Sequence, residues 1–282
     1  MSLKKIKSYA KINLSLNVLG KLTSKFHKIE TIISFIDLYD EIHIKKIQEK
    51  KHKVVFYGSF SRNIPKNNTV TDLLSKLDSK KLLNNQKYLI KINKKIPLKS
   101  GLGGGSMNAA SILNYFLKKK IINNKKLQIN KIIKQIGSDV IFGMQKKISI
   151  LKGSGVFHRS NIKLNLYLLI IKPNFGCSTA EIYRGIKYFS NASKFNNYKK
   201  IFNIKNLINL KNDLEKSAFK MHPKLLEIKK KMLKLPKILF VRMTGSGSSM
   251  IGYFKSKKAT INAAKLLKKN YRHYWCTVSK TV

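Results

Sequence analysis

The sequence is poor in acidic residues. It has 12 Asp and Glu against 59 Lys and Arg, for a formal net charge of +47. Only five of the basic residues are arginines, the side chain preferred for bidentate recognition of phosphates and bases, and no recognised nucleic-acid-binding motif accompanies the charge. Lysine, isoleucine and asparagine all have A/T-rich codons, so a drift in base composition explains the charge. A nucleic-acid binder stays open as an alternative, but we expect a protein that attracts small anionic substrates.

Cysteine and long apolar segments are also scarce. Cys177 and Cys276 lie far apart and without the spacing of a metal site, so we expect reduced thiols and no metal bound by protein side chains alone. No apolar run approaches 18 residues, which argues against a transmembrane helix. Residues Met1 to Lys7 contain no apolar core of signal-peptide length. These absences predict a cytoplasmic protein.

Glycine, in contrast, is concentrated between Ile96 and Ala110, where four of the five positions from 101 to 105 are glycine. Tyr88 to Ile92 predicts a short apolar strand before this stretch. Helical spacing follows it at Ala109, Ile112, Leu113, Phe116 and Leu117. A strand, a glycine-rich loop and a helix N-terminus in succession suit a phosphate, because backbone N–H groups are accessible there and the helix dipole is positive. Taken alone, the stretch also fits a flexible glycine turn.

Three familiar phosphate loops do not fit this stretch. A Walker A loop needs a lysine after the last glycine, and the dinucleotide fingerprint needs a third glycine at position 106, where serine stands. A protein-kinase glycine loop should be followed by His-Arg-Asp and Asp-Phe-Gly, and neither occurs. The stretch instead resembles the Pro-x-x-x-Gly-Leu-Gly-Gly-Gly-Ser loop of the GHMP kinases, which are small-molecule kinases of a separate fold.

Further segments resemble this family, in order and along nearly the whole chain. They are Ala10–Leu14, Phe26–Thr31, Gly137–Val140, Lys172–Tyr183, Asn212–Glu215 and Met243–Gly247. The resemblance implies an α+β protein with the two-domain GHMP kinase fold. Residues 1–152 would form the N-terminal ATP-binding domain and residues 153–282 a C-terminal ferredoxin-like α/β layer, with the active site between them.

The resemblance also implies an activity. It is the ATP-dependent phosphorylation, with Mg²⁺, of the C2 hydroxyl of 4-diphosphocytidyl-2-C-methyl-D-erythritol, a cytidyl diphosphate sugar alcohol of non-mevalonate isoprenoid biosynthesis. Other small-molecule kinases of the family, of the homoserine or mevalonate type, stay open as alternatives. The oligomeric state is not implied.

Two residues acquire catalytic roles from the resemblance. Asp139 follows a helix predicted over residues 129–136, where local sequence favours a helix cap; the resemblance makes it the base that accepts a proton from the substrate hydroxyl. Lys11 lies on the polar face of a strand predicted to be half-buried over Lys11–Leu19. A solvated lysine is the default there, whereas the resemblance places Lys11 beside the aspartate and the transferred phosphoryl group.

The remaining assignments concern the two substrates. The acceptor is expected on Asn13, Phe26, His27, Thr179 and Tyr183, with the rings stacking on cytosine and His27 hydrogen-bonding to the base edge. The alternatives are that Phe26 belongs to the core and that His27 is a loop histidine. ATP is expected on Pro97, Leu98, Lys99, Ser100, Gly101, Leu102, Gly103, Gly104, Gly105, Ser106 and Met107.

Some residues depart from the family pattern or carry weaker assignments. The family has a small residue where Lys99 stands and usually serine where Met107 stands, so Lys99 is expected either to add a charge at the phosphates or to crowd the loop. Asn67-Asn68-Thr69 predicts a helix cap before Val70, and Asn68 also matches the segment on the adenine side. The Thr244–Ser249 turn, which by itself predicts only a hairpin, is expected from the resemblance to close over the phosphates.

Overall fold

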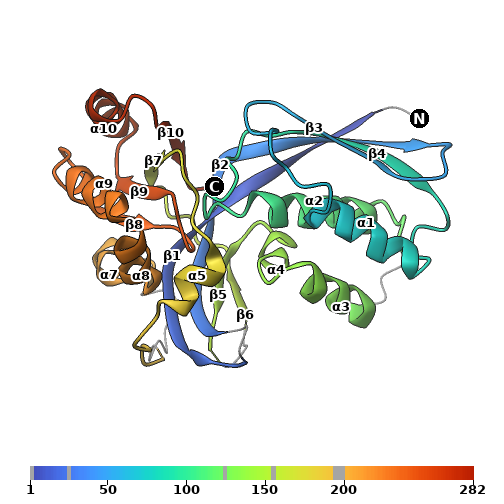
Figure 1. Cartoon of the computed structure of the whole chain (residues 1–282), viewed down its shortest axis with the longest axis horizontal. Coiled ribbons are helices and arrows are strands. Elements are labelled where there is room, and N and C mark those ends of the chain that lie inside the picture. The colour runs from blue at the N-terminus through green and yellow to red at the C-terminus, as the bar shows by residue number, and fades with distance from the viewer. Residues whose placement is uncertain (1–2, 24–26, 123–125, 154–156, 193–200) are drawn as a thin grey trace. The chain divides into compact units, whose positions relative to one another are not determined.

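The computed structural model describes residues 3–23, 27–122, 126–153, 157–192 and 201–282. The chain forms two compact units (Figure 1). Unit 1 comprises Met1–Ala10, Leu38–Leu98 and Gly103–Lys146; unit 2 comprises Lys11–Asp37, Lys99–Leu102 and Lys147–Val282. Neither unit is a continuous stretch of chain, because the long strands β1 (Lys4–Lys21) and β2 (His27–Ile47) each contribute to both. The division at residue 152 and the active site between the domains stay predictions.

Unit 1 is a sheet with helices packed on it (Figure 1). Within it, β2 pairs antiparallel with β4 (Lys87–Asn93), and β3 (Lys53–Tyr57) pairs parallel with β4. The helices are α1 (Thr69–Ser79), α2 (Gly104–Lys118), α3 (Lys126–Ile136) and the short α4 (Val140–Gly143). One apolar core joins sheet and helices through Ile42, Ile44, Ile90, Ile92, Leu73, Leu113 and Ile132. The strand and the helix predicted on either side of the glycine-rich stretch are confirmed as β4 and α2.

The N-terminus of α1 follows directly from local sequence. The Asn68 Oδ1 atom accepts hydrogen bonds from the N–H groups of Val70 and Thr71, and the Thr71 Oγ1 atom accepts one from the N–H of Asn68. This reciprocal arrangement satisfies helix N–H groups that would otherwise lack partners. The Asn68 amide therefore already has a structural role, and its assignment to the adenine side stays a prediction.

Unit 2 is built on four antiparallel strands in the order β10 (Trp275–Lys280), β7 (Tyr167–Lys172), β9 (Met250–Phe254) and β8 (Phe240–Met243). Its core joins this sheet to α5 (Thr179–Arg184), α8 (Leu214–Met221), α9 (Pro223–Leu233) and α10 (Lys257–Asn270). The helix α7 (Ile204–Asn209) precedes α8. Strand β5 (Ile148–Leu151) pairs with the first part of β2 and with β6 (Phe157–Ser160). The α+β class is confirmed.

Strand β1 corrects one prediction. The alternation of apolar and polar residues does separate two faces, but the strand is not half-buried. On the polar face Lys11, Asn13 and Ser15 are at most 4% exposed, and on the apolar face Ile12 and Leu14 are fully buried. Buried polar groups are costly unless they find partners, so this face must be held by hydrogen bonds.

Candidate functional site

The glycine-rich stretch leaves β4 from a fixed position. The Asp40 Oδ1 atom accepts hydrogen bonds from the N–H groups of Lys95, at 2.7 Å, and Ile96, at 2.9 Å. The other oxygen of this carboxylate pairs with the Lys94 ammonium, and both side chains are almost completely buried. The ion pair thus anchors the chain at the start of the candidate phosphate loop. Sequence analysis missed this anchor; the only signal was that Asp40 is one of 12 acidic residues.

The loop itself uses left-handed backbone where it turns into α2. Gly101 has φ +75° and Gly103, the N-cap of α2, has φ +71°, conformations that glycine adopts without strain. The N-cap residue itself, being glycine, has no side chain that could cap this helix. Its first N–H groups are therefore available to an anion, and the helix dipole favours negative charge at this end.

The eleven residues predicted to bind ATP divide by burial. Pro97, Ser100, Leu102 and Met107 are buried, whereas the other seven are half-buried or exposed. The Met107 side chain packs against Gly143, where an added Cβ would lie 3.0 Å from its sulfur. Leu98, Lys99, Gly101 and residues 103–106 are thus the part of the loop that could face a ligand.

Lys99 is accommodated without crowding the loop. The aliphatic part of its side chain lies against Gly176. A Cβ added to Gly176 would be 2.4 Å from the Lys99 Cβ atom, so position 176 has room only for glycine. Lys99 is exposed, although its backbone is left-handed with φ +48°. Of the two expectations for Lys99, an added exposed charge fits this arrangement and crowding does not.

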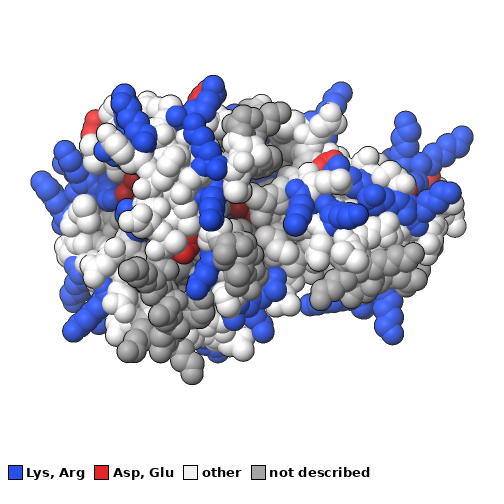
Figure 2. Space-filling view, turned by 90° about the horizontal axis from the view of Figure 1, so that it is seen from below, with Lys and Arg blue, Asp and Glu red and all other residues white. Residues whose placement is uncertain are grey.

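Other basic side chains lie on the surface drawn in Figure 2. On this face, Lys and Arg are scattered among uncharged residues. Several of the few carboxylates are paired, including those of Glu41 with Lys5 and Glu215 with Lys229. This distribution favours a general electrostatic attraction of anions over a dedicated nucleic-acid surface.

The buried polar face of β1 forms a hydrogen-bonded network. The Lys11 Nζ atom donates to the Asn13 Oδ1 atom at 2.8 Å, and the Asn13 Nδ2 atom donates to the Thr31 Oγ1 atom at 2.8 Å. The backbone N–H of Asn13 donates to the Thr244 Oγ1 atom, and that of Lys11 donates to the Leu102 carbonyl. Lys11 is therefore not a solvated lysine: its side chain is buried, its ammonium is held by Asn13, and its backbone bonds to the glycine-rich stretch.

Asp139 lies between α3 and α4, in unit 1. It is half-buried, and although it occupies the N-cap position of α4 its carboxylate makes no capping hydrogen bond. The cap interpretation is thus correct for the position of Asp139 but not for its side chain. Ser106 of the loop lies near Gly137, two residues before Asp139: a Cβ added to Gly137 would be 3.8 Å from the Ser106 Oγ atom. Lys11 belongs to unit 2, so its pairing with Asp139 stays a prediction.

The structure brings His27 and Tyr183 together in unit 2. Their ring centroids are 4.9 Å apart with planes inclined by 36°. Burial, with a smaller contribution from Lys21, lowers the pKa of His27, so the ring is mainly neutral at pH 7 and offers one N–H donor and one acceptor. Among the described residues, its buried Nε2 atom has no hydrogen-bond partner. Phe26 lies outside the described residues.

Thr179 lies at the first turn of α5, at an exposed position. Its hydroxyl is 2.8 Å from that of Ser246 in the Thr244–Ser249 turn. Two hydroxyls at this distance from segments far apart in sequence form a small polar surface. Such a surface can hydrogen-bond to an anionic ligand.

The thiols of this protein are poor nucleophiles. Burial raises the pKa of Cys177 to about 11 and that of Cys276 to about 11. At pH 8 only about one thiol in a thousand would be a thiolate. We expect iodoacetamide at pH 8 to leave both residues largely unmodified in the folded protein and to modify both in urea, as measured by peptide mass spectrometry. Fast alkylation of the folded protein would contradict the raised pKa values.

Within the described ranges, no group of three or more His, Cys, Asp and Glu side chains could hold a metal ion. In the same ranges, no helix is long and apolar enough to cross a membrane.

Two family models match this chain. The model described as GHMP kinases N terminal domain matches residues 68–147, and the model described as GHMP kinases C terminal matches residues 197–273. These ranges fall on opposite sides of residue 152, without fixing a boundary there.

Curated relatives match nearly the whole chain. A Pelagibacter ubique (strain HTCC1062) protein named 4-diphosphocytidyl-2-C-methyl-D-erythritol kinase is 52% identical over 278 residues, which cover 99% of this chain and 99% of its own length. A Clostridioides difficile (strain 630) protein of the same name is 32% identical and covers 96% of this chain and 93% of its own.

Solved structures share the fold. A crystal structure of 4-(cytidine 5'-diphospho)-2C-methyl-D-erythritol kinase aligns with a TM-score of 0.76 at 22% identity, covering 98% of this chain and 99% of that one. A homoserine kinase from Cytophaga hutchinsonii aligns with a TM-score of 0.65 at 16% identity, covering 100% and 97%.

Proposed function

This chain belongs to the GHMP kinase family, and on that basis we propose that it phosphorylates the C2 hydroxyl of 4-diphosphocytidyl-2-C-methyl-D-erythritol, a step of non-mevalonate isoprenoid biosynthesis. The observation that carries the proposal is 52% identity, over 99% of both chains, to a relative with that kinase name. As a GHMP kinase it uses ATP as the phosphoryl donor. We place the reaction in the cytoplasm, in keeping with two unpaired cysteines.

The cytidyl end of the acceptor is proposed to bind at His27 and Tyr183. Cytosine presents a flat face and an edge with both donor and acceptor atoms. The Tyr183 ring can stack on that face, and a neutral His27 with an unused Nε2 atom can hydrogen-bond to the edge. Thr179 and Asn13 are proposed to contact the remainder of the acceptor. Phe26 is proposed as a further acceptor-binding residue on the basis of the sequence alone.

The chemistry is proposed to rest on Asp139 and Lys11. Asp139 would accept the proton of the C2 hydroxyl as its oxygen attacks the γ-phosphorus of ATP, while the bond to the β-phosphate oxygen breaks and ADP leaves. The position of Asp139 supports this role: it is half-buried, and Gly137, two residues before it, lies near Ser106 of the loop. Lys11, held by Asn13, would stabilise the negative charge on the transferred group.

The glycine loop fits a triphosphate because the N-cap of α2 is a glycine without a capping side chain, and a helix N-terminus favours anions. We propose that residues 97–107 hold ATP. Mg²⁺ would be carried by the phosphates, since this ion is commonly bound by substrate phosphates with only one or two protein carboxylates. We propose Asp139 as one such carboxylate, because Gly137, two residues before it, lies near Ser106 of the loop.

Other activities are distinguishable. A homoserine or mevalonate kinase would have no use for a cytosine site, so cytidine nucleotides would not compete with its acceptor. A nucleic-acid binder would show steeply salt-dependent binding and no ATP turnover. An ATPase-coupled assay with the cytidyl acceptor, homoserine and mevalonate separates all three.

The test of the cytidyl site is the variant His27→Ala. We expect the apparent affinity for the acceptor to fall by about tenfold or more, since losing a hydrogen bond to a buried group costs about 1–3 kcal/mol. The KM for ATP should change little. CDP should compete with the acceptor in the wild type and less well in the variant.

The matched control is His273→Ala, which removes an exposed histidine near the C-terminus. This variant should behave as wild type. If CDP instead competes only with ATP, or inhibits wild type and His27→Ala equally, the cytidyl assignment fails, while membership of the kinase family is unaffected.

A further inference from the structure

The Thr244–Ser249 turn is paired with the first half of the glycine loop. The N–H groups of Ser248 and Ser249 donate to the carbonyls of Lys99, at 3.3 Å, and Ser100, at 3.2 Å. The Thr244 Oγ1 atom lies 3.2 Å from the Gly101 carbonyl, to which it donates. Because these bonds join the two loops along their backbones, the position of the turn sets the position of residues 99–101.

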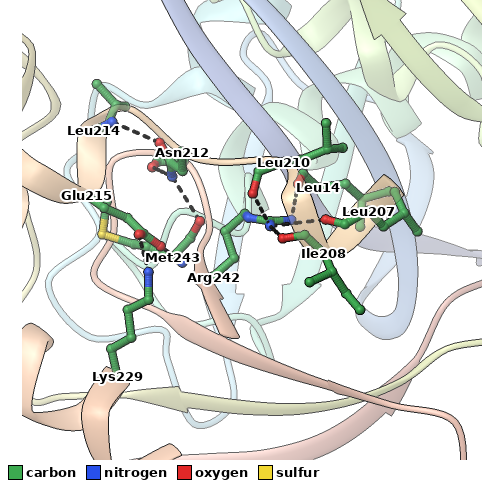
Figure 3. A network of polar contacts seen from close by, with 11 residues as sticks. Leu14, Leu207, Ile208, Leu210, Asn212, Leu214, Glu215, Lys229, Arg242 and Met243 are labelled. Atoms are coloured by element: carbon green, nitrogen blue, oxygen red, sulfur yellow. Dashed lines mark hydrogen bonds and ion pairs between the residues drawn. The ribbon is translucent and has the colours of Figure 1, made fainter. Parts of the chain in front are cut away.

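One buried asparagine, Asn212, hydrogen-bonds to the backbone of the turn (Figure 3). The Asn212 Nδ2 atom donates to the Met243 carbonyl at 2.9 Å and to the Gly245 carbonyl at 2.8 Å. Its Oδ1 atom accepts from the N–H of Leu214 at 3.0 Å. The side chain is only 3% exposed, and it contacts the turn on both sides of Thr244.

Neighbouring groups fix Asn212 itself. The N–H of Leu16 donates to the Lys211 carbonyl, and the N–H of Asp213 donates to the Leu16 carbonyl, so this segment is pinned to β1. Figure 3 shows the Arg242 guanidinium donating to carbonyls of Leu14, Leu207, Ile208 and Leu210. The Glu215 carboxylate accepts from the N–H of Met243 and pairs with Lys229. Asn212 is thus a rigid support for the turn.

The bond to the Gly245 carbonyl orients the next amide. In a trans peptide the C=O and the following N–H point in opposite directions, so the N–H of Ser246 points away from buried Asn212. Ser246 is the one residue between 241 and 250 that is not buried. Its hydroxyl adjoins that of Thr179. An outward amide and two hydroxyls form a set of hydrogen-bond donors suited to phosphate oxygens.

We infer that Asn212 is a positioning residue of the kinase reaction: it aims the Ser246 amide at a phosphate of a bound substrate and holds the turn against the glycine loop. The inference rests on the proposed function. Phosphoryl transfer depends on alignment, and a displacement of about 1 Å can cost a factor of roughly 10² in rate. Asn212 touches neither substrate in this scheme, so it acts through the loops alone.

The test uses Asn212→Asp, which keeps the shape but sets a carboxylate against two carbonyls, and Asn212→Ala, which removes the donor without adding charge. The matched control is the neighbour Asp213→Asn. The Asp213 Oδ2 atom accepts from the N–H of Val18 and from the Ser190 hydroxyl, not from the turn. The two backbone bonds to Leu16 that pin the Asn212 segment to β1 remain in this variant. For each variant kcat, both KM values, the thermal midpoint and hydrogen exchange of residues 244–249 are measured.

We expect both Asn212 variants to lower kcat by roughly 10- to 100-fold and to speed hydrogen exchange of residues 244–249. Asp213→Asn should lower the thermal midpoint to a similar extent. Its kcat and the hydrogen exchange of its turn should stay within about twofold of wild type. The inference is overturned if folded Asn212 variants keep wild-type kcat, or if Asp213→Asn loses as much kcat at the same thermal midpoint.

The hydrogen-exchange readout does not depend on the acceptor. If the wild type fails to phosphorylate the cytidyl acceptor, the proposed function fails. Unchanged exchange in the turn of an Asn212 variant overturns the positioning role whatever the substrate is. Should Asn212→Asp not fold, Asn212→Ala supplies both measurements.

Discussion

Replacing Asp139 with asparagine is expected to lower kcat by roughly 10² to 10⁴ while leaving ATP affinity nearly intact. Asparagine keeps the shape of the side chain but cannot accept the proton of the attacking hydroxyl. Because asparagine keeps the size of this half-buried side chain, we expect the variant to fold, with a thermal midpoint close to that of wild type. Steady-state kinetics and nucleotide titration measure the two effects separately.

The matched control is Asp72→Asn, since Asp72 is an exposed carboxylate on the first turn of α1, paired only with Lys76 at the surface. A surface ion pair contributes about 0–1 kcal/mol, so this variant should be fully active. Turnover of Asp139→Asn within a few-fold of wild type would remove Asp139 from the catalytic role.

Replacing Gly101 with alanine is expected to damage both stability and ATP turnover. An added Cβ would lie 2.1 Å from the Thr244 carbonyl oxygen and 3.1 Å from that of Gly247, and backbone carbonyls cannot rotate away as a flexible side chain can. The left-handed backbone at this position, with φ +75°, adds about 1–2 kcal/mol for a residue that carries a Cβ. The turn must therefore move away from the loop.

We expect Gly101→Ala to lower the thermal midpoint by several degrees and kcat/KM for ATP by at least roughly tenfold, since misplaced phosphate-binding groups lose alignment. Gly20→Ala is the control, because its φ of +157° is also unfavourable for alanine, whereas a Cβ there meets nothing within 4 Å, so this variant lacks the clash. A folded Gly101→Ala variant with wild-type stability and ATP kinetics would show that the two loops are not rigidly paired.

The features that the sequence predicted correctly have local causes. The glycine cluster specified a loop between β4 and α2, because left-handed backbone at Gly101 and Gly103 is strained for any residue that carries a Cβ. Asn68 specified the start of α1, because a cap acts on N–H groups two and three residues ahead. Period-two alternation identified β1 and its two faces.

The features that sequence analysis missed depend on partners far away in the chain. Alternation cannot tell whether a polar face meets solvent or another segment, so the burial of Lys11 and Asn13 was not predicted. The Asp40 carboxylate finds its partners more than 50 residues later, at Lys94, Lys95 and Ile96. No local propensity encodes such pairs.

The sequence by itself therefore determined the glycine-rich loop between β4 and α2, the α+β class and the family of this protein. Only the tertiary structure decided how the loops are held: Asn212 reaches Met243 and Gly245 across 31 and 33 residues, and Thr244 reaches Asn13 across 231. The physical reason is that backbone conformation and periodicity are properties of neighbouring residues, whereas a buried polar side chain takes its role from the groups that folding brings to it.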